Sequence, residues 1–253
     1  MFIQRMVIQP IQPTLIQQCN DIRGRRQIAR APALLLACVL LTSALPLGAF
    51  QSTHPVTGRR FANVMGMGGA DWLVRGERET EENVEGALDA IGIQPASTVA
   101  EIGAGVGYVA LKMSKRVGPS GTVFANDIQQ AMLTRLQETT ARLGIRNVTA
   151  VLGEPDDPKL PAGRMDLIIL VDVYHEFSQP QKMLRGIRSA LKPDGRLVLL
   201  EYRKEDPAVP ILADHKMSVA EVKAELEPEG FRLAQTIESL PRQHILIFRK
   251  AVN

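Results

Sequence analysis

Apolar and polar residues along most of the chain follow two alternating patterns. Short continuous apolar runs, typical of buried strands, are separated by segments in which apolar residues recur every three or four positions, as in amphipathic helices. The predicted strands span residues 98–101, 121–125, 147–152, 165–171, 196–200, 231–237 and 244–248. The predicted helices span residues 75–91, 106–117, 128–143, 180–191 and 218–227. This alternation predicts a parallel, doubly wound α/β sheet.

Two features refine this prediction of the fold. Residues 165–171 are almost wholly apolar, as expected for a parallel strand that is buried on both faces. The last two strands are joined by the short segment Leu240-Pro241-Arg242, which predicts an antiparallel pair. We therefore expect a Rossmann-like, mostly parallel sheet with helices on both faces and an antiparallel C-terminal edge strand. It is expected to form one domain over residues 79–253.

Residues 1–50 have a different pattern, which is typical of a secretory leader. Several arginines precede an apolar run from Ala31 to Phe50, and small residues occur near its end. An uncleaved membrane anchor is an alternative, because the run is close to the length that spans a bilayer, and so is a later translation start at Met65 or Met67. We expect an exported or membrane-anchored protein, or a cytoplasmic one if the leader is not real. Residues 51–78, irregular and rich in glycine, are predicted to form a linker or lid.

The distribution of charge along the chain argues against a nucleic-acid partner. The formal net charge is +3, but the leader carries five arginines and one acid, so bases and acids nearly balance in the rest of the chain. The sequence has no basic stripe of the kind that binds nucleic acid. We therefore expect a small-molecule substrate, no nucleic acid, and membrane association only through the leader. The oligomeric state is not indicated by the sequence.

The positions of cysteine and histidine argue against two further kinds of site. Both cysteines, Cys19 and Cys38, lie in the leader, which excludes disulfides, thiolate metal sites and cysteine nucleophiles from residues 51–253. The four histidines, none at the HxxxH or HExxH spacing of a zinc site, are His54, His175, His215 and His244. The sequence therefore predicts no metal site.

A glycine-rich turn after the first predicted strand is the strongest candidate for a binding site. The strand ends at Glu101 and is followed by Gly103, Gly105 and Gly107. Alternate glycines let the backbone adopt positive φ and let a ligand approach main-chain N–H groups without meeting a Cβ atom. This predicts a nucleotide-sized site, although a turn that serves only strand-to-helix packing is the alternative. The dinucleotide fingerprint would have a glycine where this chain has Tyr108.

Acidic residues stand at the ends of several predicted strands. Ligands of doubly wound sheets bind outside the carboxyl ends of the strands. The acids at these ends are Glu101, Asp127, Glu154, Asp172 and Glu201. Asp127 follows Gly107 at about the 20-residue spacing at which an acid reaches the hydroxyls of a ribose. Since a carboxylate accepts both hydroxyl protons, Asp127 favours a free 2′,3′-diol over a 2′-phosphate.

With these motifs the sequence resembles the class I S-adenosylmethionine-dependent methyltransferases. The run from Glu101 to Gly107, the acid Asp127 and the turn from Leu191 to Leu197 match that family's pattern, and the resemblance covers about residues 80–250. It implies S-adenosyl-L-methionine as the cofactor. The residues expected to hold it are Glu101, Gly103, Ala104, Gly105 and Gly107 at the methionine end, Asp127 and Ile128 at the ribose and adenine face, Glu154 at the adenine edge, and Asp172.

The stretch from Asp172 to Phe177 and the pair Gln243-His244 resemble a subgroup of small bacterial methyltransferases, often of unassigned substrate. Methyl transfer needs an acceptor aligned with the S–CH₃ bond and, for most acceptors, the removal of a proton. His175 is predicted to be that base because the ordinary pKa of histidine is about 6.5. A structural histidine bonded to a backbone carbonyl is the alternative. Tyr174 is predicted to orient the substrate or to cover the cofactor.

The prediction for function is therefore an S-adenosylmethionine-dependent methyltransferase with a small-molecule acceptor. The acceptor atom is not indicated. An NAD-dependent oxidoreductase is one alternative, which Glu101 and Tyr108 disfavour. A non-catalytic Rossmann-like binding domain at the cell surface is another. The leader favours it, since S-adenosylmethionine is made in the cytosol.

Overall fold

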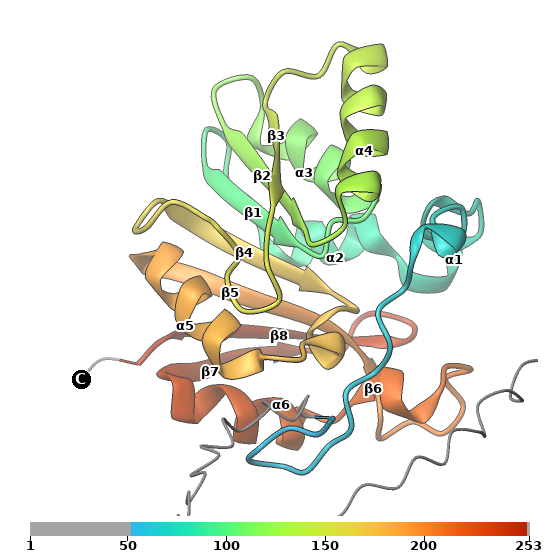
Figure 1. The fold of residues 1–253 in the computed structure, drawn as a ribbon, viewed down its shortest axis with the longest axis vertical. Coiled ribbons are helices and arrows are strands. Elements are labelled where there is room, and N and C mark those ends of the chain that lie inside the picture. The colour runs from blue at the N-terminus through green and yellow to red at the C-terminus, as the bar shows by residue number, and fades with distance from the viewer. Residues whose placement is uncertain (1–51, 252–253) are drawn as a thin grey trace, which may run out of the picture. The chain divides into compact units, whose positions relative to one another are not determined.

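A computed structural model describes residues 52–251, and these residues form a mixed sheet flanked by helices (Figure 1). The strand order is β3-β2-β1-β4-β5-β8-β7, with β6 paired to β5. β8 runs antiparallel to both of its neighbours, and all other pairs are parallel. The strands are β1 Thr98–Ile102, β2 Thr122–Asp127, β3 Val148–Leu152, β4 Met165–Val171, β5 Leu191–Arg203, β6 Lys216–Met217, β7 Phe231–Ile237 and β8 Gln243–Lys250. The predicted fold class is confirmed.

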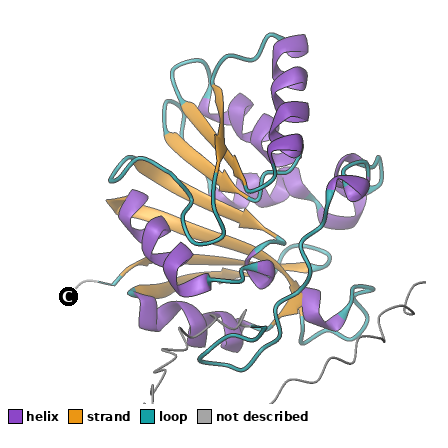
Figure 2. Cartoon of the chain, viewed as in Figure 1, coloured by secondary structure: helices purple, strands orange, loops and turns teal. Residues whose placement is uncertain are grey.

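The helices cover both faces of the sheet (Figure 2). They are α1 Arg78–Glu82, α2 Val84–Ile91, α3 Tyr108–Val117, α4 Gln130–Leu143, α5 Pro180–Ala190 and α6 Val219–Leu226, with short 3₁₀ turns η1 Met67–Gly69, η2 Trp72–Val74, η3 Tyr174–Glu176, η4 Ala213–His215 and η5 Glu227–Glu229. Buried side chains of α2, α3 and α4 pack on one face, and those of α5 and α6 pack on the other. In β4, Leu167 and Ile169 belong to the first core and Ile168 to the second, so this strand is buried on both sides.

Three elements differ from the prediction, and one of them is the short strand β6, which was not predicted. The helix expected over residues 75–91 is divided, because Asn83 adopts a left-handed conformation (φ +52°) between α1 and α2. Its side chain accepts a hydrogen bond from Gly86 N–H at 3.2 Å and caps α2, a conformation and role that asparagine tolerates better than most residues. The fifth strand is longer than expected, since β5 extends at both ends beyond residues 196–200.

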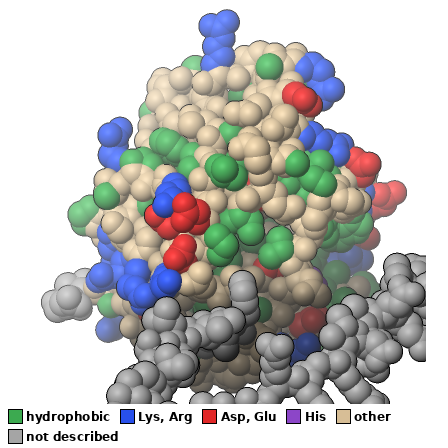
Figure 3. Space-filling view, in the orientation of Figure 1, with side chains coloured by type: hydrophobic (Ala, Val, Ile, Leu, Met, Phe, Trp, Pro, Cys, Tyr) green, Lys and Arg blue, Asp and Glu red, His purple; other side chains and the backbone are tan. Residues whose placement is uncertain are grey.

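The surface of the described residues carries both signs of charge. Figure 3 shows Lys and Arg side chains together with Asp and Glu side chains on one face. Within residues 52–251 no helix is long and apolar enough to cross a membrane. The predicted leader over residues 1–50 lies outside the described residues, so export or anchoring stays a prediction.

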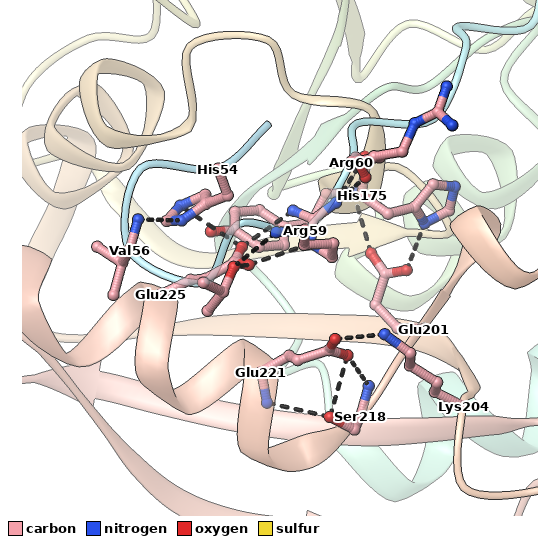
Figure 4. A network of polar contacts seen from close by, with 12 residues as sticks. His54, Val56, Arg59, Arg60, His175, Glu201, Lys204, Ser218, Glu221 and Glu225 are labelled. Carbon is pink, nitrogen blue, oxygen red and sulfur yellow. Dashed lines mark hydrogen bonds and ion pairs between the residues drawn. The ribbon is translucent and has the colours of Figure 1, made fainter. Parts of the chain in front are cut away.

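The segment 52–66, which we call the N-terminal strap, runs past the carboxyl ends of the central strands (Figure 1). Its anchor is Arg59, which is buried and donates to Glu225 of α6 at 3.1 Å and 2.9 Å. A third bond runs from Arg59 Nη1 to the carbonyl oxygen of His175 at 3.0 Å (Figure 4). The same carbonyl accepts from Ala62 N–H at 3.1 Å. The strap is therefore fixed both to α6 and to η3.

We expect Arg59→Ala to lower the free energy of unfolding by about 3–5 kcal/mol, because it leaves the buried carboxylate of Glu225 without its cation. Urea denaturation of the full chain measures this change. Arg60→Ala is the matched control, since Arg60 is the exposed neighbour and its loss should change stability by about 0.5 kcal/mol or less. Equal stability of the two variants would contradict the anchoring role of Arg59.

Candidate active site

A cavity of about 700 Å³ opens at the carboxyl ends of the central strands. One wall comes from the strap, from Arg60 to Met65. The opposite wall comes from the glycine loop after β1 and from the ends of β2 and β4, and the segment 210–215 completes the cavity. Its volume is within the range of sites that enclose a small molecule or a cofactor.

The glycine loop is built for close packing and for access to a ligand. Gly103 and Gly105 line the cavity, both with positive φ. A Cβ atom at Gly103 would lie 2.4 Å from Val173, and one at Gly107 would lie 2.2 Å from Leu136. Ala104 is buried beside them, and its N–H donates to the carbonyl of Asn126 at 2.8 Å. Packing explains Gly107, whereas Gly103 and Gly105 also expose main chain to the cavity.

Asp127, at the end of β2, is joined directly to this loop. One carboxylate oxygen accepts from Gly105 N–H at 2.8 Å, and the other accepts from Gln129 N–H at 2.8 Å. Burial raises the pKa of Asp127, and these N–H bonds oppose the shift. Each oxygen keeps a lone pair, and Asp127 and Ile128 both line the cavity. Ile128 is 40% exposed, so a flat apolar surface is available beside the acid.

Two other strand-end carboxyls carry an oxygen with no partner. Glu101 is buried, and its Oε2 has no hydrogen-bond partner among the described residues. Burial raises its pKa to about 8, with Arg78 opposing the shift and Asp127 adding to it. Asp172 has φ +51° after β4. Its Oδ2 accepts from Gln243 Nε2 at 2.9 Å, and its buried Oδ1 has no hydrogen-bond partner within residues 52–251.

Burial, followed by the like charges of Glu82 and Glu201, raises the pKa of Asp172 well above its usual range. Asp172 lines the cavity, whereas Glu101 lies outside its wall. Buried carboxyl oxygens without partners are uncommon in folded proteins. Both groups therefore favour a cationic ligand close to the glycine loop.

His175 lies in the cavity wall and is held from two sides. Its Nδ1 lies 2.6 Å from Glu201 Oε2, and its Nε2 lies 3.1 Å from Nδ1 of His215. The other oxygen of Glu201 accepts from Tyr174 N–H at 3.0 Å. Burial lowers the pKa of His175, but the charge of Glu201 and the bond to it reverse the effect, and the net shift is upward. Figure 4 shows the bond between His175 and Glu201 beside Arg59 of the strap.

Two further titratable groups line the same end of the cavity. Burial raises the pKa of Glu176 to about 7, with the opposite charge of His175 limiting the shift and Glu201 adding to it. The pKa of His215 is lowered, first by burial and then by the charge of His175. The cavity therefore has a cluster of proton-carrying groups, His175, Glu176 and His215, in addition to the glycine loop.

Five predicted site residues do not line this cavity: Glu101, Ala104 and Gly107 in or beside the glycine loop, and Glu154 and Tyr174 elsewhere. Glu154 lies in an exposed turn and pairs with Lys159 at 3.2 Å, while its neighbour Pro155 lines the cavity. Tyr174 is fully buried and packs edge-on against Phe177 at 5.5 Å in the core. The structure gives neither Glu154 nor Tyr174 a place beside a ligand.

Three residues of the candidate site are not indicated by the sequence motifs. Arg59 fixes the strap and the backbone of His175, Glu176 adjoins His175, and His215 comes from a loop that follows β5. Glu176 belongs to the stretch from Asp172 to Phe177 that resembles the methyltransferase subgroup, so its place next to His175 is a signal in the sequence. No sequence signal connects Arg59 or His215 with His175, because only the fold brings them together.

A glycine loop after β1, an acid after β2 that braces it, and a cavity at the carboxyl ends of a mixed sheet define a class I S-adenosylmethionine-dependent methyltransferase. A family model described as a methyltransferase domain matches residues 93–241, more than half of the chain. The chain belongs to this methyltransferase family, and S-adenosylmethionine is its cofactor. The family match favours a methyltransferase over the two alternatives, the oxidoreductase and the non-catalytic domain.

Among curated proteins, the chain is 30% identical over 166 residues to the ubiquinone/menaquinone biosynthesis C-methyltransferase UbiE of Pasteurella multocida, which covers 63% of this chain and 62% of that protein. It is 31% identical over 118 residues to the protein of the same name from Escherichia fergusonii, covering 46% and 47%. The chain thus spans less than two thirds of the length of these relatives.

Among solved structures, an S-adenosylmethionine-dependent methyltransferase from Aquifex aeolicus is 26% identical, with a TM-score of 0.69 over 73% of this chain and 98% of that one. The [4+2]-cyclase SpnF matches with a TM-score of 0.57 at 15% identity, over 68% and 81% of the two chains. That second likeness concerns the fold alone. Since one fold carries different chemistries, the acceptor must be argued from the site.

We expect the affinity for S-adenosylmethionine to rise with pH between about pH 6 and about pH 7.5, by up to about tenfold per unit. Glu101, whose pKa is raised to about 8, is largely protonated in this range, and a cation at the loop favours its ionised form. A proton must therefore leave on binding, so binding is weaker at low pH. This pH range lies below the pKa of the cofactor's own amino group, about 7.7–8.0, so the amino group stays mostly protonated throughout.

Calorimetry in buffers of different ionisation enthalpy measures both the affinity and the number of protons released. Glu101→Gln is the control, because it keeps the shape of the side chain and removes its titration. A pH dependence that is the same in wild type and Glu101→Gln would assign the proton to another group. Arg78 and Asp127 are the charged neighbours that face Glu101.

Proposed function

We propose that this methyltransferase transfers the methyl group to a ring carbon of a small hydroxylated aromatic acceptor of the quinol type. The observation that carries the proposal is His175, which lines the same cavity as the glycine loop and is bonded to Glu201. The likeness to C-methyltransferases named for ubiquinone and menaquinone biosynthesis supports carbon as the acceptor atom and a quinol as the acceptor class.

The residues of the loop fit the cofactor. Gly103 and Gly105 leave room for main-chain contacts at its methionine end. Glu101 and Asp172 each have a carboxyl oxygen without a partner in the described part of the chain, which suits the cofactor's positive charges. Asp127 keeps one lone pair on each oxygen for the two ribose hydroxyls, and Ile128 provides an apolar surface for adenine. The cofactor supplies an activated methyl group on a sulfonium.

The other part of the cavity fits a flat, partly apolar molecule. Phe61 of the strap, Phe177 and Leu212 line it, and the polar end is formed by His175, Glu176 and His215. An acceptor ring between these apolar side chains would present a hydroxyl to the polar end. Loss of that hydroxyl's proton makes the neighbouring ring carbons nucleophilic. Proton transfer at such a positioned group typically contributes about 10²–10⁴ in rate.

The methyl group then moves from sulfur to carbon. The ring carbon forms a bond to the methyl group while the S–CH₃ bond breaks, and sulfur keeps the electron pair as a neutral thioether. The ring carbon afterwards loses its hydrogen as a proton, which restores aromaticity, and the oxygen takes back a proton to give the hydroxyl, so that one proton is released for each methyl group transferred. The protein's part is to align the two molecules, since the sulfonium is already a good leaving group.

The test uses the full chain, S-adenosylmethionine and 1,4-dihydroxynaphthalene as the acceptor probe. We expect cofactor binding by calorimetry and a product that has gained one methyl group and kept both hydroxyls, identified by mass spectrometry and NMR. A methyl ether as the product would overturn carbon as the acceptor atom. Failure to bind the cofactor would overturn the proposal as a whole.

A further inference from the structure

Three side chains with metal-ligand atoms meet at the polar end of the cavity. His175 and Glu176 lie in η3, and His215 lies in η4, 40 residues after His175. Each offers one ligand atom, and these atoms lie within 4.8 Å of one another. Across residues 52–251 this is the one cluster of at least three His, Cys, Asp or Glu side chains that meets this distance. We call it the His-Glu-His cluster.

The distance between the two imidazoles suits a shared cation. Nε2 of His175 lies 3.1 Å from Nδ1 of His215. Two nitrogens bound to one ion at about 2.1 Å lie about 3.0 Å apart when the bonds are at right angles and about 3.4 Å apart at the tetrahedral angle. The two nitrogens are therefore already at the separation that a shared ion requires. Two imidazoles and one carboxylate beside a cavity are the ligand set of catalytic zinc and non-haem iron sites.

The surroundings of His175 have the form that metal-bound histidines usually show. The fully buried Glu201 lies 2.6 Å from Nδ1, so a proton on Nδ1 is shared with a carboxylate and the lone pair of Nε2 faces the cluster. Such an outer carboxylate fixes the ring and makes the ligand nitrogen more basic. Glu201 is itself fixed by Tyr174 N–H, and the His175 carbonyl by Arg59 and Ala62.

We propose that His175, Glu176 and His215 bind a divalent transition-metal cation of the zinc or iron(II) type at the acceptor end of the cavity. The inference rests on the proposed function, because the open positions of the ion would take the hydroxyl oxygen of the acceptor. A bound cation acidifies such a hydroxyl, whose proton then leaves to water. His175 would act as a ligand in place of the base predicted from the sequence.

The prediction of no metal site rested on the spacing of the histidines along the chain. That spacing detects two ligands on one helix. Here the ligands come from two 3₁₀ turns in separate loops. A site of this kind has no local sequence motif, and the sequence therefore did not predict it.

The test measures metal binding directly. Cys19 and Cys38 are also zinc ligands by type, so both are changed to serine in every full-length protein compared. After removal of metal with a chelator, Zn²⁺ is titrated by calorimetry. We expect one equivalent per chain at the cluster, with binding at least about 100-fold weaker in His215→Ala and weaker in Glu176→Gln, since even loss of an outer partner costs about 10–100-fold.

His244→Gln is the matched control. His244 is a buried histidine that pairs with Glu205 and Glu238, outside the cluster, and its loss should leave the cluster's affinity unchanged. Circular dichroism checks that each variant is folded. Absence of Zn²⁺ binding, or the same affinity in wild type, His215→Ala and Glu176→Gln, would overturn the metal site. Cofactor binding by the same proteins is measured separately, so failure of the metal site and failure of the proposed function are distinguishable.

Discussion

Asp127→Asn should weaken the binding of S-adenosylmethionine by at least about 100-fold. Both carboxylate oxygens of Asp127 already accept a main-chain N–H at 2.8 Å, from Gly105 and from Gln129. An amide NH₂ in place of either oxygen would face one of these donors, so the glycine loop would lose a brace. The variant would also lose the charge that strengthens bonds to the ribose hydroxyls, each about 1.5–3 kcal/mol. Calorimetry at one pH measures the loss.

Glu154→Gln is the matched control for this variant. Glu154 is also an acid at a strand end, after β3, and the sequence places it at the adenine edge. In the structure it is exposed and pairs with Lys159, so we expect its loss to change the affinity by about threefold or less. A large effect of Glu154→Gln together with a small effect of Asp127→Asn would contradict the arrangement of the cofactor site.

The fold was predictable because its elements are encoded by local patterns. The seven strands expected from apolar runs occur in β1 to β5, β7 and β8, since continuous apolar sequence fits strands buried on both faces. β6 was missed because two residues are too few to form a pattern. The break at Asn83 was missed because the acids before it fit the first turn of one longer helix, whereas the left-handed backbone of Asn83 separates α1 from α2.

The candidate site was predictable only where its residues follow strands. Asp127 and Asp172 line the cavity because parallel strands bring their carboxyl ends to one edge of the sheet. Tyr174 and His175 are adjacent in the sequence, yet one side chain is in the core and the other in the cavity wall. The sequence does not specify which of two neighbours in a 3₁₀ turn faces inward. Arg59 and His215 reach the site from loops, which have no periodic pattern.

Glu201→Gln should lower kcat by about 10²–10⁴-fold and leave the affinity for S-adenosylmethionine within about threefold, as expected when the carboxylate that orients a histidine is replaced. The reason lies in the two bonds of Glu201. Oε1 accepts from Tyr174 N–H at 3.0 Å, so the amide oxygen must stay there, and the NH₂ group must face Nδ1 of His175. Nδ1 then accepts, and the proton of a neutral ring moves to Nε2.

A proton on Nε2 occupies the lone pair that faces His215. His175 could then neither accept a proton from the acceptor nor bind a metal ion through Nε2. Single-turnover kinetics with saturating cofactor separates this loss from product release. Tyr174→Phe, in the same 3₁₀ turn, is the control: its hydroxyl is buried without a hydrogen-bond partner among the described residues, and we expect kcat within about twofold. If Tyr174→Phe lost as much activity as Glu201→Gln, the tyrosine hydroxyl predicted from the sequence to orient the substrate would carry the chemistry, and Glu201 would serve folding alone.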